Sequence, residues 1–187
     1  VAVQDVAVEF LANNRKELFP GTPLVFLANA RSRQRPENST GIVSELSFGG
    51  TLALAAALQP AVRNVFVVSG ASSRDKVYEA VARGQLQPFE SSLTLTYLSG
   101  LPAKDLEARL ARLPANSIVY FLLVNRDGAG ENYKPLDFLD RVTAVANAPV
   151  YCWVDAAMDH GIVGGKLRDQ KALADGVGAL ALRVLRG

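Results

Sequence analysis

The feature that most constrains the fold is a series of short, uninterrupted apolar runs, most of which alternate with stretches of helical periodicity. The clearest runs lie at residues 64–69, 93–98 and 117–124. A strand that is apolar along its whole length needs cover on both faces, which is typical of a parallel sheet with helices on both sides. The pattern therefore predicts an α/β fold with parallel sheets and helices on both sheet faces.

The other expected elements follow from the same alternation. Further strands are expected at residues 24–27, 41–43 and 149–154, with a short glycine-flanked strand at 162–163. Helices are expected at residues 2–18, 51–58, 73–86, 103–113, 134–147 and 167–185, with Ser72 or Ser73 as the N-cap of the third. A polar loop is expected at 29–40, where Arg31, Arg33 and Arg35 are interpreted as solvent-facing side chains or, alternatively, as an interaction patch.

Composition narrows the functional classes. Of the 187 residues, 49% are hydrophobic and 20% are charged, so the chain can bury a core. The net charge of +2 provides no general attraction for nucleic acid or for an anionic membrane, so neither is an expected partner of this chain. No apolar run approaches the ~20 residues of a membrane span. The chain begins at Val1, within an expected helix, and is interpreted as a fragment of a longer protein.

Polar and glycine residues are concentrated in the loops that follow expected strands. Four such loops begin after Val43, Ser69, Val124 and Val154. The carboxyl ends of parallel strands meet at one edge of a sheet, and ligands bind at that edge in open α/β folds. We therefore expect these loops to hold a small polar ligand. In the first of them, Ser44 and Glu45 are the expected ligand-binding residues.

The loop after Ser69 is built from small residues ahead of a helix. Ser69, Ala71 and Ser72 leave backbone N–H groups open to an anion or a carboxylate, and we expect them to contact the ligand. An ordinary serine-rich helix cap is the alternative interpretation.

The loop after Val124 contains an arginine next to an acid. Arg126 is suited to a bidentate pair with a ligand carboxylate, and Asp127 is suited to hold an amine or to pair with Arg126. Gly128 and Gly130 allow a sharp turn but do not complete a dinucleotide-binding motif. A long surface loop without a ligand is the alternative interpretation.

The loop after Val154 contains Asp155, Asp159 and the single histidine, His160. Asp155 and His160 are expected to hydrogen-bond the ligand, with a self-contained polar turn as the alternative. A metal site is not expected, because no second histidine or suitably placed cysteine completes a ligand set. Cys152 lies inside an apolar run and is interpreted as a small core residue.

Catalytic motifs do not emerge from the sequence. A Gly-x-Ser-x-Gly elbow and a phosphate-binding loop are both missing, so we expect no catalytic residues and no cofactor. An enzyme on a Rossmann-like sheet, with Asp155 and His160 as acid and base, remains a competing hypothesis. A receiver-like interaction domain is a weaker one, because the paired acids expected after a first strand are not visible.

Several segments resemble a known family. They are Gly41–Ser44, Leu58–Pro60, Val65–Gly70, Leu113–Tyr120, Arg126–Gly130, Ala148–Tyr151 and His160–Gly165. The first three resemble the periplasmic-binding-protein-like family of ABC-transporter substrate-binding components. The others resemble the version found as the extracytoplasmic sensor region of bacterial histidine kinases.

The resemblance implies a two-lobed type I binding-protein fold. Residues 1–61 with 148–187 would form the first lobe and 62–147 the second, with hinge crossings near 60–63 and 147–149. A ligand would bind in the cleft between the lobes and draw them together. Members of the family have about one further strand–helix–strand unit before the point where this chain starts, which leaves open whether the first lobe is complete.

The resemblance also implies a function without catalysis. The chain would sense a small polar ligand, an amino acid or a carboxylate, in the periplasm or another extracytoplasmic space. Flanking segments would tether the full-length protein to the inner membrane and pass the signal to a kinase, and a homodimer is left open. A solute-binding component of an ABC transporter is the alternative. Sugars are disfavoured, because Phe48 and Tyr133 are the only aromatic residues in the candidate loops.

Overall fold

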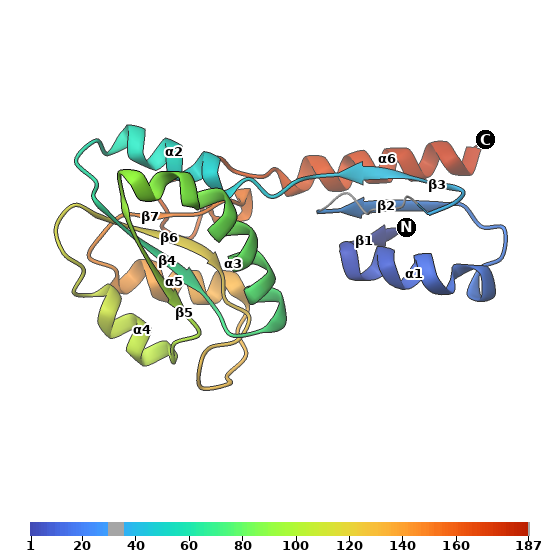
Figure 1. Cartoon of the computed structure of the whole chain (residues 1–187). Helices are drawn as coiled ribbons and strands as arrows, with labels where there is room; N and C mark the ends of the chain where they lie inside the picture. The colour runs from blue at the N-terminus through green and yellow to red at the C-terminus, as the bar shows by residue number, and fades with distance from the viewer. Residues whose placement is uncertain (30–35, 187) are drawn as a thin grey trace. The chain divides into compact units, whose positions relative to one another are not determined.

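The computed structural model describes residues 1–29 and 36–186, so the arginine cluster at 31–35 lies outside the described residues. Contacts between residues divide the chain into two compact units (Figure 1). The first unit comprises Val1–Leu46 and Asp169–Gly187, and the second comprises Ser47–Arg168. Each unit contains its own parallel sheet.

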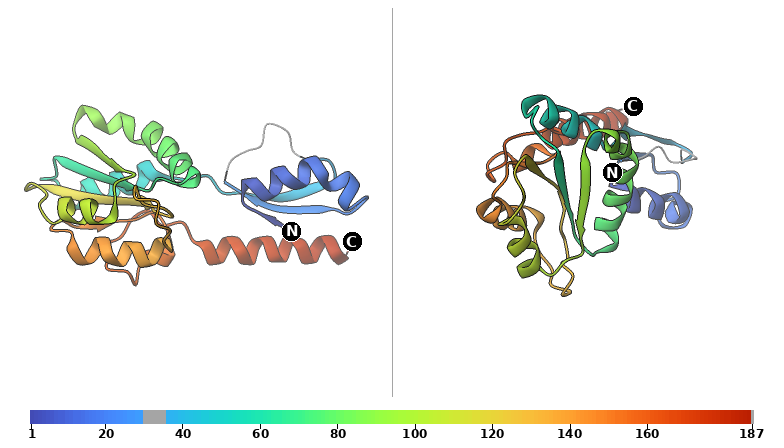
Figure 2. Two further views of the ribbon diagram at one scale, coloured as in Figure 1. Left: turned by 90° about the horizontal axis from the view of Figure 1, so that it is seen from below. Right: turned by 60° about the vertical axis from the view of Figure 1, so that its left-hand side comes forward.

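The first unit is a three-stranded sheet with a helix on each face. Its strands are β1 (Ala2–Val3), β2 (Leu24–Ala28) and β3 (Ser39–Val43), which pair in parallel in the order β1-β2-β3. Helix α1 (Asp5–Leu18) and helix α6 (Gln170–Arg186) lie on opposite faces of this sheet (Figures 1 and 2).

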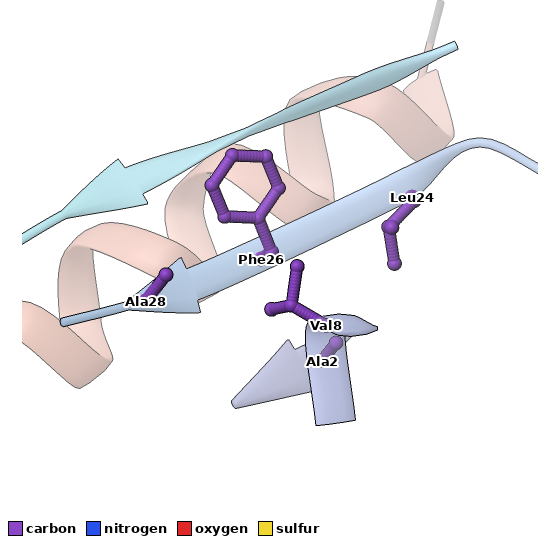
Figure 3. Close-up of a cluster of buried hydrophobic side chains, with 5 residues drawn as sticks. All are labelled: Ala2, Val8, Leu24, Phe26 and Ala28. Carbon is purple, nitrogen blue, oxygen red and sulfur yellow. The ribbon is translucent and has the colours of Figure 1, made fainter. Parts of the chain in front are cut away.

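The core of the first unit lies between β2 and α1. It consists of Ala2, Val8, Leu24, Phe26 and Ala28, which are labelled in Figure 3. Next to it, Gly41 of β3 lies close to Phe26, so that a Cβ at this position would collide with the Phe26 carbonyl oxygen and ring. Glycine therefore allows β3 to approach β2 over its whole length.

The second unit is a four-stranded parallel sheet in the order β5-β4-β6-β7. The strands are β4 (Asn64–Ser69), β5 (Thr94–Ser99), β6 (Ser117–Leu123) and β7 (Val150–Tyr151). The helices are α2 (Phe48–Leu58), α3 (Ser73–Leu86), α4 (Ala103–Leu110) and α5 (Pro135–Val145), with short 3-10 turns η1 (Gln87–Ser91) and η2 (Asp155–Ala157). Helices α2 and α3 pack together on one sheet face, and α4 and α5 pack together on the other (Figure 2).

An aromatic cluster fills the core beneath α2 and α3. The rings of Phe48 and Trp153 lie edge to face with their centroids 5.4 Å apart, and Tyr78 and Tyr120 also contact Phe48. Two polar atoms of this cluster are hydrogen-bonded: Tyr120 Oη donates to the Phe48 carbonyl (3.0 Å) and Trp153 Nε1 donates to the Leu122 carbonyl (2.7 Å). The cluster therefore combines a large apolar contact area with fixed ring orientations.

The fold class expected from the sequence is confirmed: the chain is α/β, with parallel sheets covered by helices on both faces. The strand at 64–69 and the helix at 73–86 have the expected bounds. The expectation that the chain starts inside a helix is wrong. Ala2 and Val3 pair with Phe26 and Leu27 of β2, and helix α1 begins only at Asp5.

The expected strand at 149–154 is also shorter in the structure. Only Val150–Tyr151 pairs with β6, because the chain beyond it bonds instead to a returning segment. Cys152 N donates to the Gly164 carbonyl (3.1 Å), and Val154 forms an isolated bridge with Arg168. The structure therefore has isolated bridges instead of the strand expected at 162–163. Helix α6 begins at Gln170, three residues after the expected start at residue 167.

The observed units differ from the lobes expected from the resemblance. The chain passes between them at residues 46–47 and 168–169, whereas the expected boundaries lay at 61–62 and 147–148. The physical reason is packing. Helix α2 packs on α3, and β7 pairs with β6, so both segments belong to the second unit.

Candidate functional site

The candidate site is the carboxyl edge of the four-stranded sheet, where the loops after β4, β5 and β6 are bonded to one another. Ala71 N donates to the Arg126 carbonyl (2.7 Å), and Gly100 N donates to the Ser69 carbonyl (3.0 Å). Gly128 N donates to the Leu101 carbonyl (3.0 Å), and a Cβ on Gly128 would collide with the Gly100 carbonyl oxygen. The three loops therefore form one preorganised surface.

Asp75 is the buried carboxylate that joins two of these loops. It is 0% exposed and accepts hydrogen bonds from the backbone N–H groups of Ser72 (3.0 Å), Asn125 (3.1 Å) and Arg126 (3.3 Å). Asn125 also donates its side-chain Nδ2 at 2.6 Å. The sequence analysis missed this residue. The available signal was the Ser72-x-x-Asp75 spacing of a capping box, which the structure contains in full.

Asp127 organises the loop after β6 from inside. It is buried, and its Oδ1 accepts from the N–H groups of Ala129 (2.9 Å) and Glu131 (3.0 Å). Its Oδ2 accepts from Ala103 N (3.0 Å), at the start of α4, and from Tyr133 Oη (3.4 Å). Burial alone would raise the pKa of Asp127, but the hydrogen bonds from Ala103, Glu131 and Ala129 outweigh it and lower that pKa.

Asp127 was expected to hold a ligand amine or to pair with Arg126. Its partners are backbone amides and Tyr133, rather than Arg126 or an open amine position. A carboxylate has about four acceptor positions, and four donors already surround this one. Asp127 therefore shapes the loop that carries Arg126.

Arg126 is exposed on the outer side of this loop. Its Nε donates to Asn132 Oδ1 (3.1 Å), and the two residues form an antiparallel bridge across the loop. No ion pair to Arg126 occurs within residues 1–29 and 36–186. Among the described residues only Nε of this guanidinium is hydrogen-bonded, so its other donors remain open near the start of a loop with a fixed backbone.

The loop after β4 was interpreted either as a ligand-contacting loop or as an ordinary serine-rich helix cap, and it has features of both. Ser69 is buried and its Oγ donates to the Asp75 carbonyl (3.3 Å), while Ala71 is half-buried. Ser72 is the N-cap of α3, since its Oγ accepts from Asp75 N (3.1 Å) and its carbonyl accepts from Lys76 N. The N–H groups of residues 73 and 74 in the first helical turn have no acceptor among the described residues.

Asp155 and His160 lie after β7. Asp155 begins η2, and its Oδ1 accepts from Ala156 N (2.9 Å). His160 Nδ1 is hydrogen-bonded to Asp140 Oδ1 of α5 at 2.7 Å. This bond joins the histidine side chain to α5, on the α4–α5 face of the sheet. No group of residues able to hold a metal ion occurs in the part of the chain that the structure describes.

Ser44 and Glu45 belong to the first unit, directly after β3. Ser44 N continues the sheet by donating to the Ala28 carbonyl (2.9 Å), and its side chain is half-buried. Glu45 is exposed. Both residues therefore lie at the carboxyl edge of the three-stranded sheet.

Cys152 is buried in the second unit, and burial raises the pKa of its thiol to about 11. A thiol with such a pKa is protonated at neutral pH and is a poor nucleophile. None of the helices in the described ranges is both long enough and apolar enough to cross a membrane.

Comparisons with known proteins show the fold. No family model and no curated protein matches the chain. The structure is similar to an ABC domain from Streptococcus pneumonia solved in complex with L-Trp, with a TM-score of 0.64 and 18% identity over 99% of this chain and 64% of that one. It is also similar to a conserved domain protein from Vibrio cholerae, with a TM-score of 0.61 and 14% identity over 99% of this chain and 62% of that one.

The chain thus spans less than two thirds of the length of either structure. At this level of identity the similarity concerns the fold. The α/β fold with parallel sheets that was expected from the sequence is matched over nearly the whole chain.

Proposed function

We propose that this chain is an extracytoplasmic domain that binds a small polar ligand and senses it for signal transduction. The observation that carries the proposal is the arrangement at the carboxyl edge of the four-stranded sheet. There, Asp75 and Asp127 fix the loop backbones internally, and the open donors of Arg126 are held on the outside. A rigid scaffold with an outward charge is what a binding site needs and what a purely structural loop does not.

The chemistry of this edge favours a ligand with a carboxylate. Arg126 can form a bidentate pair with a carboxylate, and the first-turn amides of α3 attract negative charge. We propose that Ser69, Ala71 and Ser72 shape this part of the site. Asp155 and His160 are proposed as further ligand contacts in the second unit, and Ser44 and Glu45 remain the residues expected to bind a ligand in the first unit.

An amino acid is the ligand class that the comparisons favour. The ABC domain from Streptococcus pneumonia was solved with L-Trp, which has both a carboxylate and an amine. This similarity supports an amino acid or a simple carboxylate as the ligand of the present chain. It also keeps the second candidate function in view, a solute-binding component of an ABC transporter.

An enzyme is the third candidate, and the geometry disfavours it. His160 is engaged by Asp140, and Cys152 is buried with a raised pKa. The acid–base pair that an enzyme hypothesis requires would have to form between Asp155 and a histidine that already has a carboxylate partner. A turnover assay with His160→Ala distinguishes the two, because a sensor has no turnover to lose.

The test is a thermal-shift screen against amino acids, carboxylates, sugars and aromatic acids, followed by calorimetric titration of the active compound. Binding at a hundredfold excess over Kd stabilises the folded state by about 2.7 kcal/mol, which is readily measured. Arg126→Ala should abolish the shift. Arg112→Ala, which removes an exposed arginine after α4, should preserve it.

Either of two results would contradict this proposal. One is that no compound of the panel shifts the melting temperature. The other is that a shift is equal in the wild type and in Arg126→Ala, which would place the ligand elsewhere. If a ligand does bind, its partner distinguishes the two functions. A sensor acts on a kinase that responds to the ligand, and a transporter component acts with a permease that takes it up.

A further inference from the structure

Strand β5 has an open edge of an unusual kind. It pairs with β4 and with no other strand among the described residues, so it forms one border of the four-stranded sheet. Its six residues contain no charge and no proline, and its pairing with β4 contains no bulge. Natural proteins normally protect an edge strand with one of these features, because an open edge pairs with other chains.

The open main-chain groups of β5 can be identified. Thr94 N donates to the Arg63 carbonyl (2.8 Å), and Gly100 N donates to the Ser69 carbonyl (3.0 Å), so these ends face β4. The direction of N–H and C=O groups alternates along a strand, and those of Leu95, Tyr97 and Ser99 therefore face outward. No hydrogen bond reaches them from the parts of the chain that the structure describes.

Two of these residues also have unpaired side-chain groups. Tyr97 Oη and Ser99 Oγ are shielded from solvent and have no hydrogen-bond partner. Shielded polar groups nearly always have one, so these two side chains are exceptions at the border of the sheet. The Tyr97 ring itself is held in place, with the guanidinium carbon of Arg83 3.6 Å from the ring centroid.

We propose that β5 pairs with β5 of a second copy of this chain, antiparallel and about a twofold axis at Tyr97. In this register Tyr97 faces Tyr97, and Leu95 faces Ser99 of the other copy. Each such pair exchanges two N–H···O bonds, so all three outward residues are satisfied at once. A twofold interface presents the same surface on both sides, which is the commonest symmetry of soluble oligomers.

The charges that flank β5 fit this arrangement. Residues 91–103 form an uncharged stretch, bounded by Glu90 before it and Lys104 after it. Both bounding residues are exposed, and both are equally distant in sequence from Tyr97. Antiparallel pairing places the start of β5 in one copy, which Glu90 precedes, beside the end of β5 in the other, which Lys104 follows. This complementarity favours a second copy over an unrelated strand.

Sedimentation equilibrium on the whole chain over a range of concentrations tests the pairing. The wild type should show a concentration-dependent dimer. Lys104→Glu should raise the dimer Kd at least fivefold, and the double variant Glu90→Lys/Lys104→Glu should restore it. Lys134→Glu changes the net charge equally at an exposed position outside β5 and should leave the Kd unchanged.

Cross-linking tests the register. Facing residues of a hydrogen-bonded antiparallel pair have Cα atoms about 5.5 Å apart, which is within the range that a disulfide spans. Tyr97→Cys should therefore form a disulfide-linked dimer under mild oxidation. Thr94→Cys, an exposed position on the same strand, should not, because it faces Gly100.

Several outcomes would overturn the proposal. They are a wild type that stays monomeric at every concentration, a Lys104→Glu variant that dimerises as well as the wild type, or equal cross-linking at positions 94 and 97. Circular dichroism shows whether Tyr97→Cys folds. If it does not, the charge-reversal series, which leaves β5 intact, decides the question.

Discussion

Asp75 and Asn125 are fifty residues apart in the chain, yet Asn125 donates two hydrogen bonds to the Asp75 carboxylate. One comes from its backbone N and the other from its side-chain Nδ2. This carboxylate also closes the cap of α3. One buried acid thus fixes the start of a helix and the end of the central strand β6.

The first prediction concerns this acid. Asp75→Ala leaves the N–H groups of Ser72, Asn125 and Arg126 without their acceptor in a buried position. We expect a loss of about 3 kcal/mol in the free energy of unfolding, measured by urea titration. Asp137→Ala, which removes an exposed acid from the first turn of α5, is the matched control and should change little. Equal effects of the two substitutions would show that the Asp75 network is not stabilising.

The second prediction is a pH dependence from Asp127. Its pKa is lowered in the folded state, so the ionised carboxylate stabilises the fold above the ordinary aspartate pKa of about 4. That contribution is lost as the pH falls through the lowered pKa. The stability difference between the wild type and Asp127→Asn should therefore be constant from neutral pH down to about 5 and shrink below about 4. A difference that grows on acidification would contradict the assignment.

The third prediction compares two glycines. Gly128→Ala should destabilise the protein by roughly 2 kcal/mol, because the added methyl group meets the Gly100 carbonyl, a backbone atom that cannot move aside easily. Gly84→Ala, in helix α3, meets nothing within 4 Å and should stabilise by up to about 1 kcal/mol. Thermal unfolding of the two variants checks both signs. Destabilisation by Gly84→Ala would mean that the outer face of α3 is not open.

The fourth prediction concerns Cys152. The thiol is 1% exposed and its pKa is raised to about 11, so a thiol reagent at pH 8 should not react with the native protein on the time scale of minutes. Addition of urea above the unfolding midpoint should release one reactive thiol per chain. Rapid reaction of the native protein would mean that the second unit opens locally at this position.

Much of the fold could be predicted from the sequence, where a local signal decides the structure. The strand Asn64–Ser69 is a short apolar run with clear breaks, and Ser72 is a strong helix start, so both bounds of this β–α unit were predictable. Residues 149–154 form an equally apolar run, yet only two of them pair with β6, because their neighbours bond to a distant segment. No local pattern reveals a partner of that kind.

The candidate site shows the same division. Arg126 is predicted as a ligand contact from its position after a strand, and in the structure it is exposed and donates to Asn132. The internal role of Asp127 depends on Ala103, which lies on another loop, so the sequence left its partner undetermined. Asp75 was missed because an acid three residues after a helix cap is ordinary in sequence, and only the fold brings Asn125 to it.

The position of the single tryptophan determines what intrinsic fluorescence reports. Trp153 is 5% exposed, is packed against Phe48 and Tyr78, and is hydrogen-bonded to Leu122, all within the second unit. Selective excitation of indole therefore gives an emission signal from the four-stranded unit alone, while far-ultraviolet circular dichroism averages over both units. Comparison of the two transitions during denaturation would show whether the units melt together, with no label added to the chain.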